Sequence, residues 1–417
     1  MAADPTLMEE GGGLVRWSGL SQLPPAGHPW TGRNLMELVR HISGKNIQAS
    51  ILYAFSQRFP DSEVDFHASG RAALAWAFRV LADRTARSEV IIPAYTCYSV
   101  PAAAVAAGLR VRLVDVDLRG QIDVHALRRL PLERAAAVVV TNLLGVPERI
   151  GPLKTLVSEA GSFLIDDAAQ SFGGSDQMGA VGHRGDIGIL SFGRGKPLSA
   201  LGGGAAVYAR GAFERSTELG EAIPDSASVS RAILEASVYN VALWPWVFGV
   251  LSSIPGLGIG ETHYDPGFGV GVIGPKNQAL LMCGLQNVDP STHRRRRVAE
   301  ELAQSIPTRN GFSPLIADEG VIPVYPRLGL VAPTPGTRDR ALVELNLTGA
   351  GASQLYPRSL DLVEGLRPHL VDDSVCPRAR EFALRLLTLP THGRLSGRRL
   401  AKVLSILKSL AARSHDE

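Results

Sequence analysis

The stretch GDIGILSFGRGKPLSALGGGAAV (residues 185–207) is the most informative about the architecture, because it places a glycine-rich loop between two short apolar runs. IGILSF (187–192) and GGAAVYA (203–209) have the near-continuous apolar character of strands that are buried on both faces. Four runs upstream share this character: EVIIPAY (89–95), RVRLVDVD (110–117), AAAVVVTN (135–142) and SFLIDDAA (162–169). Together the runs predict a mainly parallel sheet in the first half of the chain.

Helical patterns lie between these predicted strands. SGRAALAWAFRVLAD (69–83) begins with a serine that can cap a helix and continues with good helix formers. TCYSVPAAAVAAG (96–108) and IGPLKTLVSEAG (150–161) each end on glycine, a frequent stop signal. The alternation predicts an α/β domain with helices on both faces of the sheet and right-handed crossovers.

The chain has 417 residues, which is too many for one compact core and predicts two domains. We expect a large α/β domain over residues 61–274 and a smaller α+β domain over 275–417. The segment 1–60 carries no strand series and is expected to pack on the smaller domain.

An apolar insertion near residues 220–270 interrupts the large domain. Its most apolar part, 233–260, is broken by Glu235, Asn240, Pro245 and Pro255 and has no basic flank. A spanning helix needs about 20 apolar residues. We therefore favour a buried or dimer-covering segment over an in-plane membrane contact through its tryptophans, Trp244 and Trp246, and Phe248.

The overall composition is that of a soluble globular protein, with 45% hydrophobic residues, 20% charged residues and a net charge of +3. This small charge argues against a nucleic-acid partner. The dense basic run, Arg294–Arg297, reads as a solvated or interface face of an amphipathic helix rather than as a polyanion site.

Three distant cysteines, Cys97, Cys283 and Cys376, predict neither a disulfide framework nor a metal site. The N-terminal stretch MAADPTLMEEGGG has no apolar core of a secretory signal, so we expect a cytoplasmic protein.

Lys196 is the first candidate for chemistry, because it stands in the glycine-rich loop between two predicted strands. A phosphate-binding P-loop is excluded, since Leu190 stands where that motif needs glycine and Pro197 where it needs serine or threonine. A surface lysine without a role remains an alternative. The third interpretation is a lysine that holds pyridoxal 5′-phosphate (PLP) as a Schiff base.

This third interpretation requires a carboxylate for the pyridine nitrogen of PLP, because a protonated ring is the better electron sink. Asp167 ends a predicted strand and would project from the carboxyl edge of the sheet, where ligands of open α/β sheets bind. One acid of the pair Asp166 and Asp167 is expected to face the site and the other to cap the next turn. Gln170 can offer an amide donor to the phenolic oxygen of the cofactor.

A phosphate cradle is the second requirement. Ser69, Gly70 and Arg71 open a predicted helix, whose free amides and dipole favour an anion, although a simple serine cap is equally consistent with the sequence. Ser191 supplies a further hydroxyl five residues before Lys196. Tyr95 and Tyr98 are candidates to stack on the cofactor ring, or else to pack in the core.

The chain resembles the DegT/DnrJ/EryC1/StrS aminotransferases, which are fold-type-I PLP enzymes. The matching pieces occur in family order: ASGRAAL (68–74), EVIIPAYTCYSV (89–100), GLRVRLVDVD (108–117), FLIDDAAQSFGG (163–174), GDIGILSFGRGKPLSALGGGAAV (185–207) and LTLPTHGRLSGRRLAKVLSIL (387–407). QLYPRSLDL (354–362) is similar to the family's Tyr-Pro segment. The likeness covers residues 60–210 and 275–410.

The resemblance implies that Lys196 holds PLP and moves the reacting proton, that Asp167 pairs with the ring nitrogen, and that Gln170 contacts its phenolic side. It implies that Gly70 and Arg71 bind the phosphate through backbone amides and Ser191 through its hydroxyl.

This chain departs from the family pattern at several positions. Cys97 stands where the family usually has its stacking aromatic, so that Tyr98 or Tyr95 would have to substitute. Arg71 replaces a threonine and Gly202 an acid. Gly271 and Ile273 stand where a partner-subunit asparagine and arginine are usual.

The activity implied by the resemblance is transfer of an amino group from an amino acid, usually glutamate, to a keto sugar, usually nucleotide-linked, in a homodimer. A non-sugar keto substrate and a non-catalytic regulatory relative are the alternatives. Related sugar dehydratases replace the lysine with histidine, so Lys196 argues against that branch. A nicotinamide dehydrogenase would need a GxGxxG motif after the first strand, which is missing.

Overall fold

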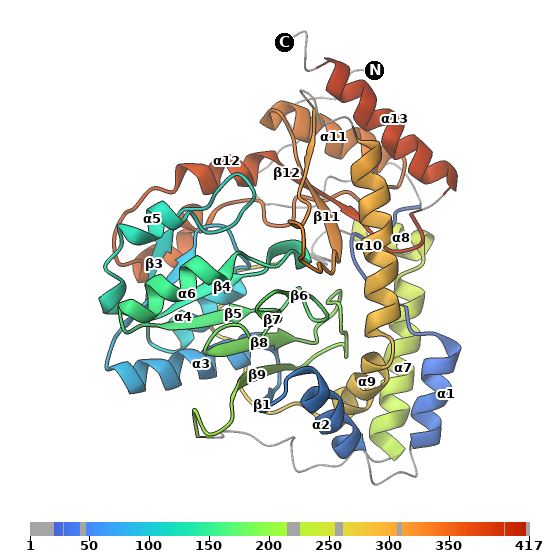
Figure 1. Ribbon diagram of the computed structural model, residues 1–417. Helices are drawn as coiled ribbons and strands as arrows, with labels where there is room; N and C mark the ends of the chain where they lie inside the picture. Colours follow the sequence, from blue (N-terminus) through green and yellow to red (C-terminus); the bar gives the residue numbers. More distant parts are fainter. Residues whose placement is uncertain are drawn as a thin grey trace.

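Seven strands form one sheet in the computed structural model, which describes residues 21–27, 29–41, 47–214, 226–254, 262–306, 311–395 and 397–413 (Figure 1). Their order across the sheet is β1 (Ser62–His67), β9 (Gly204–Ala209), β8 (Ile187–Ser191), β5 (Phe163–Asp167), β4 (Ala135–Thr141), β2 (Glu89–Pro93) and β3 (Arg110–Val114). β8, β5, β4, β2 and β3 pair in parallel, and β9 runs antiparallel to both neighbours. The six strands that the sequence predicts are present, and β1 was not among them.

Helices cover both faces of this sheet, as the apolar strands require. Alternate residues of each central strand point to opposite faces: in β4, Val139 packs with the core on the side of α3 (Gly70–Thr85) and α4 (Ser99–Ala106). Its neighbours Val138 and Val140 pack with α5 (Val124–Arg128) and α6 (Ile150–Glu159). The fold is the mainly parallel α/β arrangement that the sequence predicts.

Short elements complete the connections of the large domain. They are the 3-10 turns η2 (Leu132–Arg134) and η3 (Leu143–Gly145) and a two-stranded ribbon of β6 (Ser175–Asp176) and β7 (Gly179–Ala180).

A helical layer lies beside the β1 and β9 edge of the sheet. It contains α1 (Gly32–His41), α2 (Ile47–Arg58), α7 (Ser226–Ala242), α8 (Pro245–Ser253) and α9 (Pro275–Leu285). α1 and α2 pack on α9, and one apolar cluster joins this layer to the sheet. Among the described residues of the segment 1–60, only those around Leu23 reach the small domain, where the Leu23 amide donates to the Gly349 carbonyl at 3.0 Å.

The small domain is built around an antiparallel sheet in the order β10 (Ser313–Pro314), β11 (Arg327–Val331) and β12 (Leu386–Pro390) (Figure 1). α11 (Pro335–Leu347) and α13 (Gly397–Arg413) share one core with this sheet. α12 (Pro377–Arg385), η4 (Leu360–Leu362) and η5 (Glu364–His369) pack instead in the core of the large sheet. α10 (Val288–Ser305) links the domains, because Val288 packs in the cluster of the helical layer and Leu302 in the small-domain core.

In the described part of the chain, no helix on its own has the length and apolar composition to cross a membrane. Only α7 and α8 taken together have that length and composition, and this pair is bent by 83°.

Candidate active site

One pocket collects residues from the carboxyl ends of three parallel strands and from the start of α3. Thr141 ends β4, Asp167 ends β5 and Ser191 ends β8. The full lining is Gly70, Arg71, Leu74, Cys97, Ser99, Val100, Thr141, Asn142, Asp167, Ala169, Gln170, Ser191 and Lys196. Of the site residues that the sequence proposes, seven line this pocket, whereas Ser69, Tyr95 and Tyr98 do not.

Lys196 reaches the pocket from the loop between β8 and β9. The base of this loop is closed by backbone hydrogen bonds from Ala200 to the Phe192 carbonyl (2.7 Å) and from Phe192 to the Gly203 carbonyl (2.9 Å). In the described part of the chain, no hydrogen bond or ion pair engages the Lys196 amine, which is only partly buried. The amine is therefore available to a ligand in the pocket.

Asp167 presents a carboxylate to the same pocket. Its Oδ1 accepts from the Ala169 amide at 3.0 Å, and no other described group hydrogen-bonds this carboxylate. Burial raises the pKa of Asp167 to about 6, against the lowering effects of the Ala169 amide and the Lys196 charge. A buried carboxylate with an unused oxygen suits a cationic partner such as a protonated ring nitrogen.

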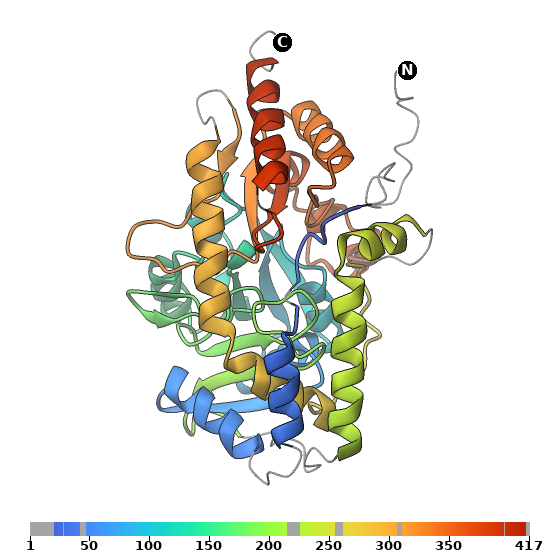
Figure 2. The same cartoon turned by 90° about the vertical axis from the view of Figure 1, so that its right-hand side faces the viewer.

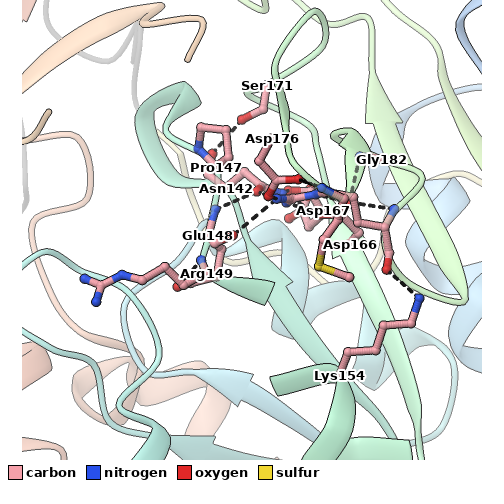
Figure 3. Close-up of polar contacts among 12 residues, drawn as sticks. Asn142, Pro147, Glu148, Arg149, Lys154, Asp166, Asp167, Ser171, Asp176 and Gly182 are labelled. Carbon is pink, nitrogen blue, oxygen red and sulfur yellow. Dashed lines mark hydrogen bonds and ion pairs between the residues drawn. The ribbon is translucent and has the colours of Figure 1, made fainter. Parts of the chain in front are cut away.

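The neighbouring Asp166 points away from the pocket and serves the fold. It forms an ion pair with Arg184 at 3.0 Å, and both side chains are fully buried. Arg184 also contacts Asp176, the Glu148 carbonyl and the Asn142 side chain (Figure 3). The prediction that one acid faces the site and the other caps the following turn was partly wrong, because Asp167 does both.

Asn142 connects this buried network to the site. Its Nδ2 donates to Asp166 Oδ1 and to the Asp167 carbonyl, both at 2.8 Å (Figure 3). Asn142 also lines the pocket, yet the sequence analysis did not single it out. The sequence does carry a signal for Asn142, because this polar residue directly follows the buried strand β4, at the same edge of the sheet where Asp167 ends β5.

Replacing Arg184 with methionine is expected to lower the free energy of unfolding by about 3–5 kcal/mol, because Asp166 would keep a buried charge without a partner. Chemical denaturation monitored by circular dichroism measures this loss. Arg149→Met is the matched control, since its ion pairs with Asp117 and Asp318 are at the surface and the side chain is 55% exposed. The control should lose at most about 1 kcal/mol of unfolding free energy. An equal loss in both variants would contradict a stabilising role for the buried ion pair of Asp166 and Arg184.

The start of α3 lies directly against Ser191. A Cβ on Gly70 would stand 2.8 Å from Ser191 Cβ and 3.1 Å from its Oγ, so only glycine allows this approach. The Ser69 hydroxyl caps the helix by accepting from the Ala72 amide at 3.1 Å, which explains its absence from the pocket lining. The N-terminal amides of α3 and the Ser191 hydroxyl thus share one corner, which is suited to an anion.

Tyr95 and Tyr98 do not line the pocket. The Tyr98 hydroxyl donates to the Arg358 carbonyl (3.1 Å) and the Tyr95 hydroxyl to the Tyr356 carbonyl (3.0 Å), which turns both rings toward the segment 354–362. Cys97 remains at the pocket, and none of its described lining residues is aromatic. The expectation that Tyr98 or Tyr95 replaces the stacking aromatic is therefore corrected.

Gln170 is fixed by two hydrogen bonds. Its Oε1 accepts from the Leu144 amide at 3.1 Å, and its Nε2 donates to the Tyr356 hydroxyl at 3.0 Å. Tyr356 belongs to the Tyr-Pro segment of the small domain, so Gln170 joins the two domains at the edge of the pocket. The sequence pattern predicts only a cofactor contact for this amide and gives no signal for its link to Tyr356.

Comparison with known proteins agrees with this geometry. Residues 61–219 match the model of the DegT/DnrJ/EryC1/StrS aminotransferase family. The match confirms, over this part of the chain, the resemblance that the sequence motifs indicate. A curated relative, the UDP-N-acetyl-3-dehydro-alpha-D-glucosamine 3-aminotransferase of Acidithiobacillus ferrooxidans, is 33% identical over 150 residues. That alignment spans 36% of this chain and only 40% of the relative.

Solved structures share the fold over most of the chain. Helicobacter pylori PseC, an aminotransferase involved in the biosynthesis of pseudoaminic acid, has a TM-score of 0.71 and 16% identity, covering 94% of this chain and 100% of that one. The PLP-form of Spr1654 from Streptococcus pneumoniae has a TM-score of 0.71 and 17% identity, covering 94% and 99%. The architecture is therefore that of the fold-type-I PLP transferases.

The pocket residues fit the cofactor that this family architecture implies. Lys196 supplies an amine, Asp167 a buried carboxylate, and the α3–Ser191 corner a place for a phosphate. These three groups have the chemical character required by the aldehyde, the ring nitrogen and the phosphate of PLP. The fit is weakest at the ring face, where Cys97 offers a thiol in place of an aromatic surface.

Proposed function

We propose that this chain is a PLP-dependent aminotransferase that transfers an amino group from an amino-acid donor to a keto sugar. One observation carries the proposal: the Lys196 amine and the Asp167 carboxylate line the same pocket at the carboxyl edge of the parallel sheet. The two residues are 29 positions apart and lie on different strand-to-loop junctions, so this meeting is a property of the fold.

Bound PLP would supply an electron sink that stabilises the negative charge developing on the substrate carbon. Lys196 would hold the cofactor covalently and, once a donor amine displaces it, give and take the proton at the reacting carbon. Asp167 would keep the ring nitrogen protonated through a charge-assisted hydrogen bond. The amides at the start of α3 and the Ser191 hydroxyl would fix the phosphate and so set the ring position.

We further propose that the acceptor is a nucleotide-linked keto sugar, used in glycan or secondary-metabolite biosynthesis, and that glutamate is the donor. The relatives support this proposal through their names, which describe aminotransferases acting on such sugars.

A spectroscopic titration tests the transaminase proposal. The protein loaded with PLP should show the visible absorbance of a lysine-linked cofactor, and adding glutamate should bleach it, because the amino group passes to the cofactor. Glutamine and alanine serve as alternative donors in parallel samples. A loaded protein whose absorbance is unchanged by every donor would refute transamination and point to a non-catalytic relative.

We also propose that the chain forms a homodimer through an apolar surface on α7 and α8. Leu234, Val238 and Val241 follow one face of α7 and are 64%, 60% and 48% exposed, while Val229 and Ala236 on the other face are buried. Trp244 and Trp246 extend this surface with exposures of 58% and 63%. An apolar surface of this extent usually marks an interaction site, and a second copy of the chain is the occupant we propose.

The double substitution Trp244→Asp and Trp246→Asp is expected to convert a dimer into a monomer, because two desolvated charges would lie in the interface. Light scattering measures the mass. Leu347→Asp is the matched control, because Leu347 is 58% exposed on α11 in the other domain and should leave the dimer intact. A wild-type monomer that sediments with lipid vesicles would contradict the dimer and favour membrane contact.

A further inference from the structure

A second pocket is lined by the N-terminal segment (Pro24 and Gly27), by Leu243 immediately after α7, by α10 and by the loop that follows β12. Figure 2 shows this segment running between α7 and α10. The lining residues that matter here are Gly27, Leu243, Arg294, Arg295, His392 and Arg394. None of the described residues that line this arginine pocket also lines the candidate active site.

The arginine pocket carries positive charge without a counter-charge. Arg294, Arg295 and Arg394 line it, no lining residue is acidic, and none of the three arginines is ion-paired in the described part of the chain. Arg295 is 3% exposed, and its guanidinium donates only to carbonyls, those of Pro326 (3.0 Å) and Gly27 (2.8 Å). Because a buried charge that has no opposite charge beside it is costly, this arrangement favours an anionic ligand.

His392 adds a hydrogen-bond acceptor to the same pocket. Its Nε2 donates to the Pro24 carbonyl at 2.9 Å, and its Nδ1, which is buried, has no hydrogen-bond partner in the structure. Burial lowers the pKa of His392 to about 4, so the ring is neutral near pH 7 and Nδ1 offers a lone pair. A ligand that satisfies the pocket therefore brings both anionic oxygens and an O–H or N–H donor.

We propose that the arginine pocket binds a phosphorylated small molecule whose phosphate oxygens accept from Arg294 and Arg394 and whose hydroxyl group donates to His392 Nδ1. Arginine suits this role because its planar fork can donate two parallel hydrogen bonds to one phosphate. Within the basic run, Arg294 and Arg297 are exposed, as the predicted solvated face requires, whereas Arg295 is buried, contrary to that prediction. Arg294 also lines the arginine pocket.

Two sources could provide this chemistry: the nucleotide part of the proposed substrate, or a free phosphorylated metabolite. The N-terminal segment separates the arginine pocket from the loop of Lys196, since Ala26 Cβ lies 3.5 Å from the position of a Cβ on Gly195. Gly27 bounds the pocket on this side with a φ of +145°, and a Cβ there would stand 2.7 Å from Leu243. A ligand in the arginine pocket is thus one chain segment away from the catalytic loop.

Calorimetric titration of the full-length holoenzyme with UDP, pyrophosphate and uridine tests the proposal at low ionic strength. We expect UDP and pyrophosphate to bind and uridine not to bind. Arg394→Ala and Arg294→Ala should each weaken binding about tenfold to a hundredfold, since each removes a charged hydrogen bond. Tighter binding of UDP than of pyrophosphate would identify a nucleotide as the source, and equal binding a free phosphorylated compound.

Arg297→Ala is the matched control, because Arg297 belongs to the same basic run and lines a neighbouring pocket but not this one. The Arg297→Ala variant should bind UDP and pyrophosphate as tightly as the wild type does. The proposal is overturned if neither UDP nor pyrophosphate binds, or if Arg297→Ala loses as much affinity as Arg394→Ala. Lys196→Ala should retain the binding, so the outcome does not depend on whether the transaminase proposal holds.

Discussion

Replacing Lys196 with alanine is expected to abolish amino transfer, with a loss of at least about a thousandfold in kcat, because the chain would lose both the covalent attachment of PLP and its proton carrier. The visible absorbance of the lysine-linked cofactor should disappear as well. Stopped assays with glutamate and absorbance spectra of the loaded variant measure the two effects.

Two further variants make this test specific. Lys196→Arg keeps a positive charge but cannot attach the cofactor, so it should behave like the alanine variant. Lys402→Ala removes an exposed lysine on α13 and should retain full activity and absorbance. Residual activity within tenfold of wild type in Lys196→Arg would show that the amine is not the attachment point.

Replacing Asp167 with asparagine is expected to lower kcat by about a hundredfold or more, because a neutral amide cannot hold the proton on the ring nitrogen. The amide oxygen can still accept from the Ala169 amide, so the turn that follows β5 should remain folded. Asp167→Glu restores a carboxylate and should recover part of the activity. A variant with wild-type kcat would exclude Asp167 as the partner of the ring nitrogen.

The pH dependence of PLP affinity gives a second readout for Asp167. In the cofactor-free protein, burial raises its pKa to about 6, so the carboxyl is neutral below that pH and charged above it. Because a protonated ring nitrogen pairs only with the charged form, affinity should fall as the pH drops through about 6. A phosphate group titrates near the same pH, so the test is the difference between wild type and Asp167→Asn, which should lack this part of the dependence.

The parallel sheet could be predicted because its central strands are buried on both faces. The runs that became β2, β4 and β5 are almost continuously apolar, and helical patterns follow the first two of them. β1 escaped prediction because its sequence, SEVDFH, mixes polar and apolar residues. This strand lies at the edge of the sheet and pairs only with β9, so its sequence bears a weaker signal.

That Lys196 and Asp167 line one pocket could also be predicted, because Asp167 ends β5, Lys196 follows β8, and the carboxyl ends of these two strands meet at one edge of the sheet. The direction of Tyr98 could not, since it depends on a hydrogen bond to Arg358, a residue 260 positions later. The link between Gln170 and Tyr356 and the burial of Arg184 depend on similarly distant or buried partners. Such contacts are set by tertiary packing, which local patterns do not encode.

The most direct test of the covalent role of Lys196 is to trap the cofactor on the protein. Reduction of the PLP-loaded enzyme with borohydride, followed by proteolysis and mass spectrometry, reports which side chain carries the pyridoxyl group. We predict a single modified peptide with the label on Lys196. A label on another lysine, or no label on a protein that nevertheless transaminates, would contradict the account.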